Sequence, residues 1–252
     1  MTELRNKRRE HYDRLVGASR DFDKQAAWLD TLFRQYSAKS VLDCGCGTGT
    51  HAILLAEKGY DVTAFDYSKE QIGLAKEKAR RHGVDVTFHV ADIKDFSLGR
   101  FDAVVSLFAP IMFGCRDQAD LTKAVTAIKR SLNDGGVALV ETPTPRMMDS
   151  DGIEVNTHAE EGLKVARVAF YTFRRDEKAA DVRYAYAMEK DGEITHDDAE
   201  ARHAYFDRDD FERAFSTAGA EAVTWYSVFN DEKGLYEPYE EGASGMITPL
   251  FK

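Results

Sequence analysis

The sequence predicts an α/β fold in which a mostly parallel sheet is interrupted by an inserted antiparallel sheet. Short apolar runs alternate with helical patterns between positions 40 and 142. This alternation implies right-handed crossovers between parallel strands. After residue 160 the runs have a period of two and are separated by polar turns, which is typical of antiparallel hairpins. The 252 residues are enough for one α/β unit with an insertion.

Five apolar runs are the expected strands of the parallel part of the sheet. They are apolar throughout instead of alternating, as expected for strands that helices cover on both faces. In chain order they are residues 40–44, 61–66, 84–92, 101–108 and 137–142.

Helices are expected in the N-terminal segment and between these strands. Apolar residues at helical spacing, capping residues and terminal glycines mark them. Ser68 and Gln71, three positions apart, have the spacing of a capping box. The expected helices are the N-terminal segment as far as Tyr36 and residues 51–59, 68–83 and 117–132.

The second half of the chain is expected to hold the insertion and then to complete the sheet. The inserted meander has three β-rich runs, namely residues 163–175, 180–190 and 194–206. A helix from Asp207 to Gly219 follows, and two last strands, 221–229 and 244–251, form a hairpin. We therefore expect three segments: residues 1–149 with the N-terminal helices and the cofactor core, 150–206 as an inserted antiparallel lid, and 207–252 completing the core.

Composition narrows the classes of partner. A net charge of −10 does not suit a polynucleotide, which needs a basic face. No apolar stretch has the length of a membrane span, and polar and basic residues follow Met1 where a signal peptide would be apolar. The cysteines, Cys44, Cys46 and Cys115, have neither the spacing of a zinc site nor that of a redox pair. We expect a cytoplasmic protein without a metal ion.

The stretch VLDCGCGTGT (41–50) follows the first strand with three glycines. A dinucleotide-binding turn would place its third glycine at position 50, but here it stands one residue earlier, at Gly49, and Thr50 takes that place. This spacing is the form used by class I methyltransferases, which bind S-adenosylmethionine (SAM). The turn by itself says nothing about the methyl acceptor.

Three aspartates at the ends of neighbouring strands match the chemical groups of SAM. Asp66 suits the ribose diol, Asp92 the adenine amine, and Asp43 the ammonium of the methionyl end. The carboxyl ends of parallel strands are where open α/β sheets bind ligands. The sulfonium needs aromatic faces or carbonyls around it. The expected cofactor residues are Asp43, Gly45, Cys46, Gly47, Gly49, Asp66, Tyr67, Asp92, Ile93 and Phe108.

Two long sequence blocks indicate a particular family within this fold class. DIKDFSLGRFDAVVSLF (92–108) and GEITHDDAEARHAYFDRDDFERAFSTAGA (192–220) resemble the N-methyltransferases that dimethylate the amino group of nucleotide-linked deoxyamino sugars. Tyr12, followed by Asp13, fits as well. The resemblance implies the Rossmann-like class I methyltransferase fold with a seven-stranded sheet, SAM as cofactor, a small amine as substrate, and Tyr12 on the acceptor side. It also marks a departure, because Phe113 stands where the family carries a histidine near the sugar amine.

Methyl transfer from a sulfonium is an in-line displacement that depends mainly on alignment and desolvation. An amine must first lose its proton, and Tyr12, Glu141 and His158 are the candidate catalytic groups. Glu141 ends the fifth strand, and His158 is expected in the loop after it. Met112 and Phe113 are expected, with Tyr12, to bind the substrate.

Several alternatives stay open from sequence alone. The acceptor is most simply an amine, but an O-methyltransferase of a small phenol or carboxylate would need less help with its proton. A nicotinamide-dependent reductase fits the glycine spacing less well, and a SAM-binding module without catalysis would need a blocked cavity. The inserted sheet, with its many aromatic residues, serves either as a substrate lid or as the interface of a homodimer. The sequence does not separate these, nor does it give the number of methyl groups added.

Overall fold

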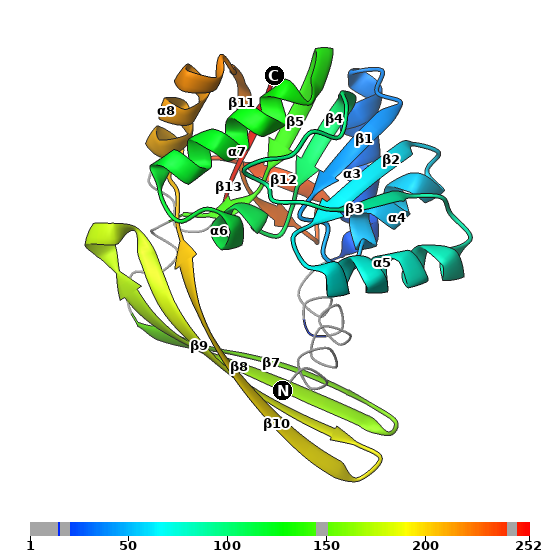
Figure 1. The fold of residues 1–252 in the computed structure, drawn as a ribbon, viewed down its shortest axis with the longest axis vertical. Helices are drawn as coiled ribbons and strands as arrows, with labels where there is room; N and C mark the ends of the chain where they lie inside the picture. The colour runs from blue at the N-terminus through cyan, green and yellow to red at the C-terminus, as the bar shows by residue number, and fades with distance from the viewer. Residues whose placement is uncertain (1–14, 16–20, 145–150, 241–245) are drawn as a thin grey trace. The chain divides into compact units, whose positions relative to one another are not determined.

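The computed structural model describes Leu15 and residues 21–144, 151–240 and 246–252, and its contacts divide the chain into two compact units (Figure 1). The larger unit comprises Phe22–Met147 and Ala204–Lys252, and the smaller one contains Met148–His203 together with the described Leu15. These divisions lie close to the boundaries expected from sequence, although Leu15 belongs to the smaller unit and not to the core. The three segments expected from sequence stay a prediction.

The larger unit is built on a mixed sheet with the strand order β12-β11-β13-β5-β4-β1-β2-β3. Strands β5, β4, β1, β2 and β3 are parallel, and β13 runs antiparallel to β5. All of the expected parallel strands are present. The bounds are β1 (Ser40–Cys44), β2 (Asp61–Asp66), β3 (Thr87–Val90), β4 (Phe101–Ser106), β5 (Leu132–Val140), β6 (Thr142–Pro143), β11 (Ala222–Asn230), β12 (Leu235–Pro238) and β13 (Met246–Phe251).

Helices cover both faces of this sheet, as the uniformly apolar strands predict. One core cluster joins the sheet to α6, α7 and α8, and a second joins its other face to α3, α4 and α5. Each cluster takes alternate residues of a strand, for example Leu42 in the first and Val41 in the second. The bounds are α3 (Phe22–Gln35), α4 (Thr50–Glu57), α5 (Lys69–His82), α6 (Pro110–Gly114), α7 (Gln118–Arg130) and α8 (Arg208–Ala218).

The sheet is wider than the seven strands that the family resemblance implies. The short strand β6 continues the line of β5 and pairs with β13, and β12 adds an outer edge beside β11. β12 returns from β11 through a turn in which Gly234 has a φ of 66°. Tyr236 of β12 packs on Trp28 of α3, with ring centroids 4.8 Å apart, and this contact holds the extra strand against the core.

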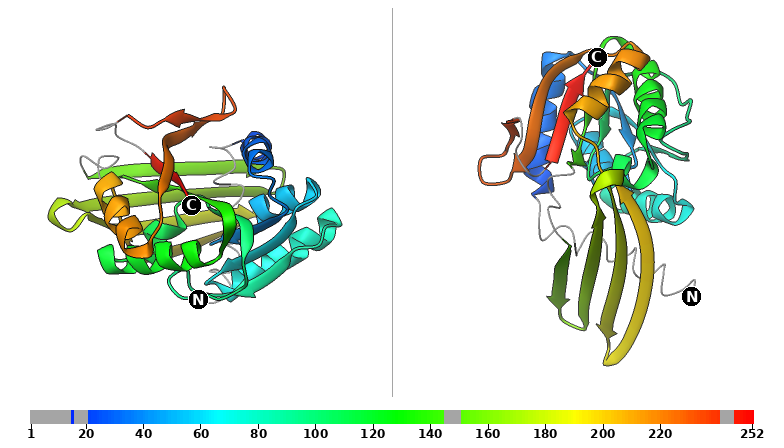
Figure 2. Two further views of the ribbon diagram at one scale, coloured as in Figure 1. Left: turned by 90° about the horizontal axis from the view of Figure 1, so that it is seen from above. Right: turned by 90° about the vertical axis from the view of Figure 1, so that its left-hand side faces the viewer.

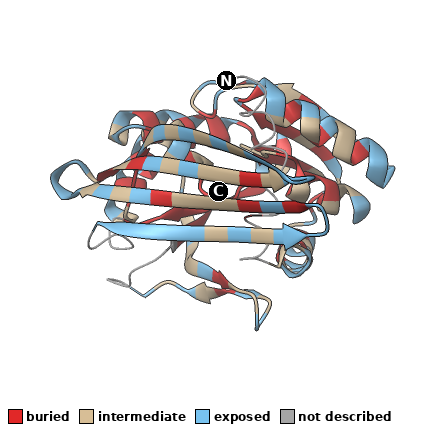
Figure 3. Cartoon of the chain, turned by 90° about the horizontal axis from the view of Figure 1, so that it is seen from below, coloured by how far each residue is buried: buried red, intermediate tan, exposed pale blue. Residues whose placement is uncertain are grey.

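The smaller unit is a four-stranded antiparallel sheet in the order β10-β9-β8-β7, which confirms the antiparallel insertion (Figure 2). The bounds are β7 (Gly152–Glu160), β8 (Leu163–Arg174), β9 (Ala179–Lys190) and β10 (Glu193–Ala204). The sequence predicts only the last three strands. β7 was missed because it lies at the edge of the sheet, where nearly all of its residues are exposed (Figure 3). The prediction of a loop around His158 is wrong, since this residue lies within β7.

The two faces of the smaller unit differ. Leu15 packs with Leu163, Val165 and Met188 into a small apolar cluster on one face. On the opposite face Ile153 of β7 stands beside Phe170 of β8, and both are exposed. This second face also carries the ion pairs Lys164–Glu189 and Arg183–Glu200, so its exposed apolar residues lie mainly on β7 and β8.

Candidate functional site

The glycine turn between β1 and α4 has the conformation that its sequence predicts. Gly45, Gly47 and Gly49 have positive φ angles of 75°, 54° and 78°, which glycine adopts without steric cost. A Cβ on Gly45 would lie 2.4 Å from the Pro110 side chain, and one on Gly49 3.0 Å from Ala75. A Cβ on Gly47 would meet no atom within 4 Å. The backbone at Gly47 therefore borders open space, as a ligand-binding turn requires.

Asp66 is tied to the glycine turn through its carboxylate. Its Oδ2 accepts a hydrogen bond from the Gly47 N–H at 3.0 Å, and its Oδ1 accepts one from the Ser68 N–H at 2.8 Å. The side chain is 7% exposed. Since the Ser68 N–H is already bound, Gln71 cannot complete the predicted capping box, and only the Ser68 hydroxyl caps α5 by accepting from the Gln71 N–H.

Asp43, at the end of β1, is a buried carboxylate with an unsatisfied oxygen. It is 3% exposed, and its Oδ2 has no hydrogen-bond partner among the described residues. Burial, and then the nearby Asp66 carboxylate, raise the pKa of Asp43 to about 7, while the Ala52 N–H opposes the shift. A buried carboxylate without a partner costs free energy unless a donor or cation reaches it. The ammonium of SAM is such a cation, so this site fits the cofactor.

The expected adenine residues follow β2 and β3. Asp92 is half-exposed, and its Oδ1 accepts from the Lys94 N–H at 2.9 Å and pairs with the Lys94 Nζ at 3.0 Å. Ile93 is 6% exposed and packs so closely on Gly114 of α6 that a Cβ there would lie 2.7 Å from it. Tyr67 is 70% exposed. These residues and the glycine turn all lie at the carboxyl ends of the parallel strands.

The segment between β4 and α6 has a strained backbone. Phe108 and Ala109 have φ angles of 62° and 59°, in the left-handed region that residues other than glycine rarely adopt. The Phe108 N–H donates to the Glu141 Oε2 at 2.9 Å, and Glu141 is fully buried. Met112 is half-buried, whereas Phe113 is 49% exposed.

A buried polar chain beside this segment was missed by sequence reasoning. The Gln25 Nε2 donates to the Tyr236 hydroxyl at 2.5 Å, and the Gln25 Oε1 lies 2.9 Å from the His51 Nε2. The His51 ring, at the start of α4, packs between Phe22 and Phe108 with centroid distances of 5.3 and 5.9 Å. Gln25 lies on the same helical face as Leu29, so the residue spacing could have predicted its burial. The spacing could not have predicted that its partner is Tyr236 of β12.

The remaining predicted catalytic residues lie elsewhere. Tyr12 falls outside the described residues. His158 belongs to the smaller unit, where its Nε2 is 3.4 Å from the Glu160 Oε2. No described contact joins Tyr12 or His158 to Glu141. The catalytic roles of Tyr12, Glu141 and His158 therefore stay predictions.

A polar network lies on the face of the smaller unit that Leu15 contacts. The Arg167 guanidinium bonds to Asn156 and Glu154 and lies 5.7 Å from the centre of the Tyr184 ring. The Tyr184 hydroxyl is 3.1 Å from the His203 Nε2, and burial lowers the pKa of His203 to about 4. The network thus keeps a neutral histidine and a paired arginine within the sheet.

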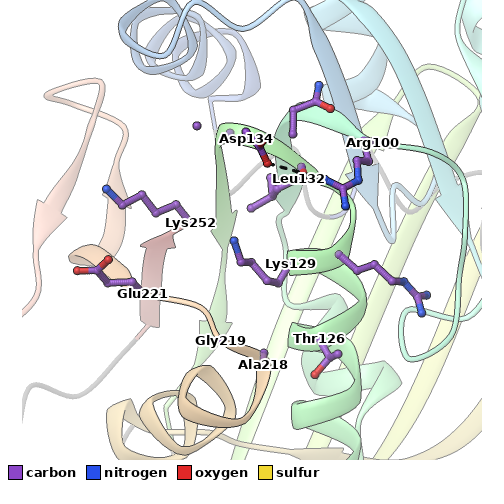
Figure 4. A pocket seen from close by; sticks show the side chains of 13 residues that line it. Arg100, Thr126, Lys129, Leu132, Asp134, Ala218, Gly219, Glu221 and Lys252 are labelled. Atoms are coloured by element: carbon purple, nitrogen blue, oxygen red, sulfur yellow. Dashed lines mark hydrogen bonds and ion pairs between the residues drawn. The ribbon is translucent and has the colours of Figure 1, made fainter.

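A cavity of about 610 Å³ lies at the other end of the large sheet, far from the glycine turn in the topology (Figure 4). It is lined by the start of β5, the last turn of α7, the end of α8 and Lys252, which follows β13. Its basic residues include Lys129 and Arg130, which occupy the last turn of α7, where cations offset the helix dipole. Their charge therefore has a structural explanation.

The described residues form neither a metal-binding cluster nor a membrane-spanning helix. Within these ranges, no group of three or more His, Cys, Asp or Glu side chains is arranged to hold a metal ion. Among the described helices, none combines the length and apolarity of a membrane span.

Comparison with known proteins agrees with the site. A family model described as a methyltransferase domain matches residues 41–136. A dTDP-3-amino-3,6-dideoxy-alpha-D-glucopyranose N,N-dimethyltransferase of Streptomyces fradiae is 33% identical over 207 residues, covering 81% of this chain and 79% of that protein. A dTDP-3-amino-3,4,6-trideoxy-alpha-D-glucopyranose N,N-dimethyltransferase of Streptomyces venezuelae is 29% identical over 208 residues, covering 81% and 85%.

A solved structure extends the similarity to nearly the whole chain. DesVI of Streptomyces venezuelae superposes with a TM-score of 0.80 at 25% identity, over 95% of this chain and 96% of its own. Glycine turn, strand order and sequence relatives therefore agree on the cofactor, which is SAM. The chain belongs to the class I SAM-dependent methyltransferases, in the family that contains the dTDP-amino-sugar N,N-dimethyltransferases.

Proposed function

We propose that the protein methylates the amine of a small, amino-sugar-like metabolite. The observation that carries this proposal is the match to two N,N-dimethyltransferases of dTDP-linked amino sugars over four fifths of the chain. A match restricted to the cofactor core would have supported a methyltransferase with any acceptor. This one extends well beyond residues 41–136, which the general methyltransferase model covers.

In this proposal the three aspartates hold the cofactor. Asp43 accepts from the ammonium with its unsatisfied Oδ2, Asp66 bonds the ribose while holding Gly47, and Asp92 faces the adenine beside Ile93. The expected roles of Gly45, Cys46, Tyr67 and Phe108 are part of the same proposal. SAM supplies a methyl group on a sulfonium, a leaving group that is already activated. What remains for the protein is alignment and the exclusion of water.

The acceptor side rests on Tyr12, Met112 and Phe113. We propose that Tyr12 orients the amine through its hydroxyl and that the proton leaves to water, because Phe113 offers no basic group where the family carries a histidine. The inserted sheet would act as the lid over the acceptor, with His158 as a further candidate proton acceptor. Of these assignments, that of Tyr12 is supported by the family resemblance.

The test is methyl transfer from labelled SAM to a panel of amino sugars, simple amines, phenols and carboxylates. We expect transfer to amines. Transfer to oxygen acceptors alone would replace the proposal with the O-methyltransferase alternative.

Tyr12→Phe in the same assay removes one hydroxyl and keeps the ring. Turnover should fall about tenfold to a hundredfold, the scale of a misplaced reacting atom. SAM affinity, measured by calorimetry, should stay at the wild-type value, since Tyr12 is assigned to the acceptor side. Equal turnover of the two proteins would remove Tyr12 from the mechanism.

We further propose a homodimer formed through the exposed face of the smaller unit that carries Ile153 and Phe170. Strands β8, β9 and β10 each have 12 residues. At about 3.4 Å per residue and about 4.8 Å between strands, the four-stranded face covers about 800 Å², which is the area one partner contributes to a standard interface. The apolar pair Ile153 and Phe170 suits a second copy of the same face.

A cytoplasmic setting is also proposed. Cys44 precedes the glycine turn and Cys46 lies within it; both are free thiols, and burial raises the pKa of each well above its ordinary value. Thiols in this state persist in a reducing compartment.

A further inference from the structure

Glu141 is fully buried where β5 ends, and the hydrogen bonds around it lead back to β4. Its N–H donates to the Ser106 carbonyl at 2.8 Å, which continues the pairing of β4 and β5. Its Oε2 accepts from the Phe108 N–H at 2.9 Å. The carboxylate is therefore bonded to the backbone of the segment that leaves β4.

The backbone conformation of this segment is intrinsically unfavourable. Phe108 and Ala109 are two successive left-handed residues, and neither is a glycine. Such strain persists only where the surroundings hold it. A charge-assisted hydrogen bond from the first of the two to a buried carboxylate is a strong restraint of this kind.

The strained segment touches the glycine turn on two sides. Pro110 lies where a Cβ on Gly45 would stand, at 2.4 Å, so the proline ring closes over the first glycine. The Phe108 ring packs on Phe22 and on His51, which is the second residue of α4 and follows the last glycine by two positions. The backbone conformation at residues 108–110 thus determines what supports the cofactor turn.

We infer that Glu141 is a positioning residue: its carboxylate holds Phe108 and Ala109 in the left-handed conformation, which seats Pro110 on Gly45 and preforms the SAM-binding turn. In this role Glu141 acts through the backbone and takes no proton from the acceptor. The inference depends on the SAM site and not on the proposed amine substrate, so either can fail alone.

The first experiment compares Glu141→Gln with Glu141→Met. Glutamine keeps an oxygen that can accept from the Phe108 N–H, whereas methionine has a similar size and no such acceptor. We expect Glu141→Gln to bind SAM within about threefold of wild type and Glu141→Met to bind about tenfold to a hundredfold more weakly, the range for loss of a hydrogen bond to a charged group. Binding is measured by calorimetry without any acceptor.

A second measurement needs no cofactor. Amide hydrogen exchange at Phe108 in the SAM-free protein should be slow in wild type and in Glu141→Gln, and at least about tenfold faster in Glu141→Met. If Glu141 instead accepts a proton from the substrate, the two variants should behave alike in SAM binding and in turnover. Both variants would then bind SAM like wild type and lose turnover together, and that result overturns the inference.

The third measurement relieves the strain directly. Ala109→Gly is introduced into wild type and into Glu141→Met, because glycine adopts the left-handed region without cost. In the Glu141→Met background it should recover about threefold to tenfold in SAM affinity, and in wild type clearly less, which gives a coupling in a double-mutant cycle. Additive effects of the two changes overturn the inference. If Glu141→Met does not fold, Glu141→Gln decides alone: a hundredfold loss of turnover at unchanged SAM affinity overturns it.

Discussion

Asp43 is the residue whose chemistry is set most by its neighbours. The folded protein binds a proton at this carboxyl, with a pKa of about 7, that the unfolded chain releases at the ordinary value of 3.8. The resulting contribution to stability is complete below about pH 4 and is lost as the pH rises through about 7. Sequence reasoning placed Asp43 correctly at the strand end, but its protonation depends on burial and on Asp66, which are properties of the fold.

Cofactor binding should therefore depend on pH. In the proposed site the SAM ammonium meets the ionised Asp43 carboxylate, so binding should expel the proton and affinity should rise up to about tenfold per pH unit between about pH 5.5 and 7. Calorimetry in two buffers of different ionisation enthalpy would detect the released proton. Asp43→Asn, which cannot titrate, should lose both the slope and the proton release; an equal slope in this variant would assign the titration to another group.

Asp66 bonds to the glycine turn and is proposed to bind the ribose of SAM, and a single substitution tests the proposed role. Asp66→Ala removes the proposed ribose partner and leaves the Gly47 and Ser68 N–H groups without this acceptor. SAM binding should weaken by about 1.5–3 kcal/mol, the scale of a lost hydrogen bond to a charged group. Asp61→Ala, at the exposed start of the same strand, is the matched control and should bind SAM normally. Unchanged binding by Asp66→Ala would exclude Asp66 from the site.

At the scale of elements, substitutions at different glycines of the turn should affect either SAM binding or folding. Gly47→Val adds a side chain where no protein atom lies within 4 Å, so the fold should survive at a cost of about 1–2 kcal/mol for the left-handed backbone while SAM binding is lost. Gly45→Ala collides with Pro110 and should instead lower the melting temperature sharply. Gly73→Ala, in the exposed middle of α5, is the control and should stabilise by about 0.5–1 kcal/mol. Normal SAM binding by Gly47→Val would show that the turn does not border the cofactor.

Strands and helices with a buried face were predictable, because their apolar spacing is a local property. Two of the edge strands, β7 and β12, were not. β7 and β12 have few buried side chains, and each exists because a neighbouring strand offers it a free edge. The capping box at Ser68 failed for a similar reason, since Asp66, near in sequence, takes the N–H that Gln71 would have needed. In each case a hydrogen-bond partner that the residue spacing does not reveal determined the local structure.

At the scale of the whole molecule, the homodimer proposal makes a clear prediction. Ile153→Asp places a charge on the exposed face of the smaller unit, opposite the apolar Phe170, and burying an unpaired charge at an interface is strongly unfavourable. Sedimentation should show a dimer for wild type and a monomer for this variant. Val223→Asp, at an exposed apolar residue of the larger unit, should remain dimeric. A monomeric wild type would refute the interface.

The strand that closes the large sheet is the last of its strands in the chain. β13 is inserted between β5 and β11, so β5 keeps an open edge until residues 246–251 have been made. About a hundred residues separate the end of β5 from the start of β13, and at about 5–20 residues per second their synthesis takes about 5–20 s. During this interval a ribosome-bound chain exposes an apolar strand edge that readily pairs with other chains. The yield of native enzyme in a cell should therefore depend on how well chaperones protect nascent chains, and slow translation should favour aggregation.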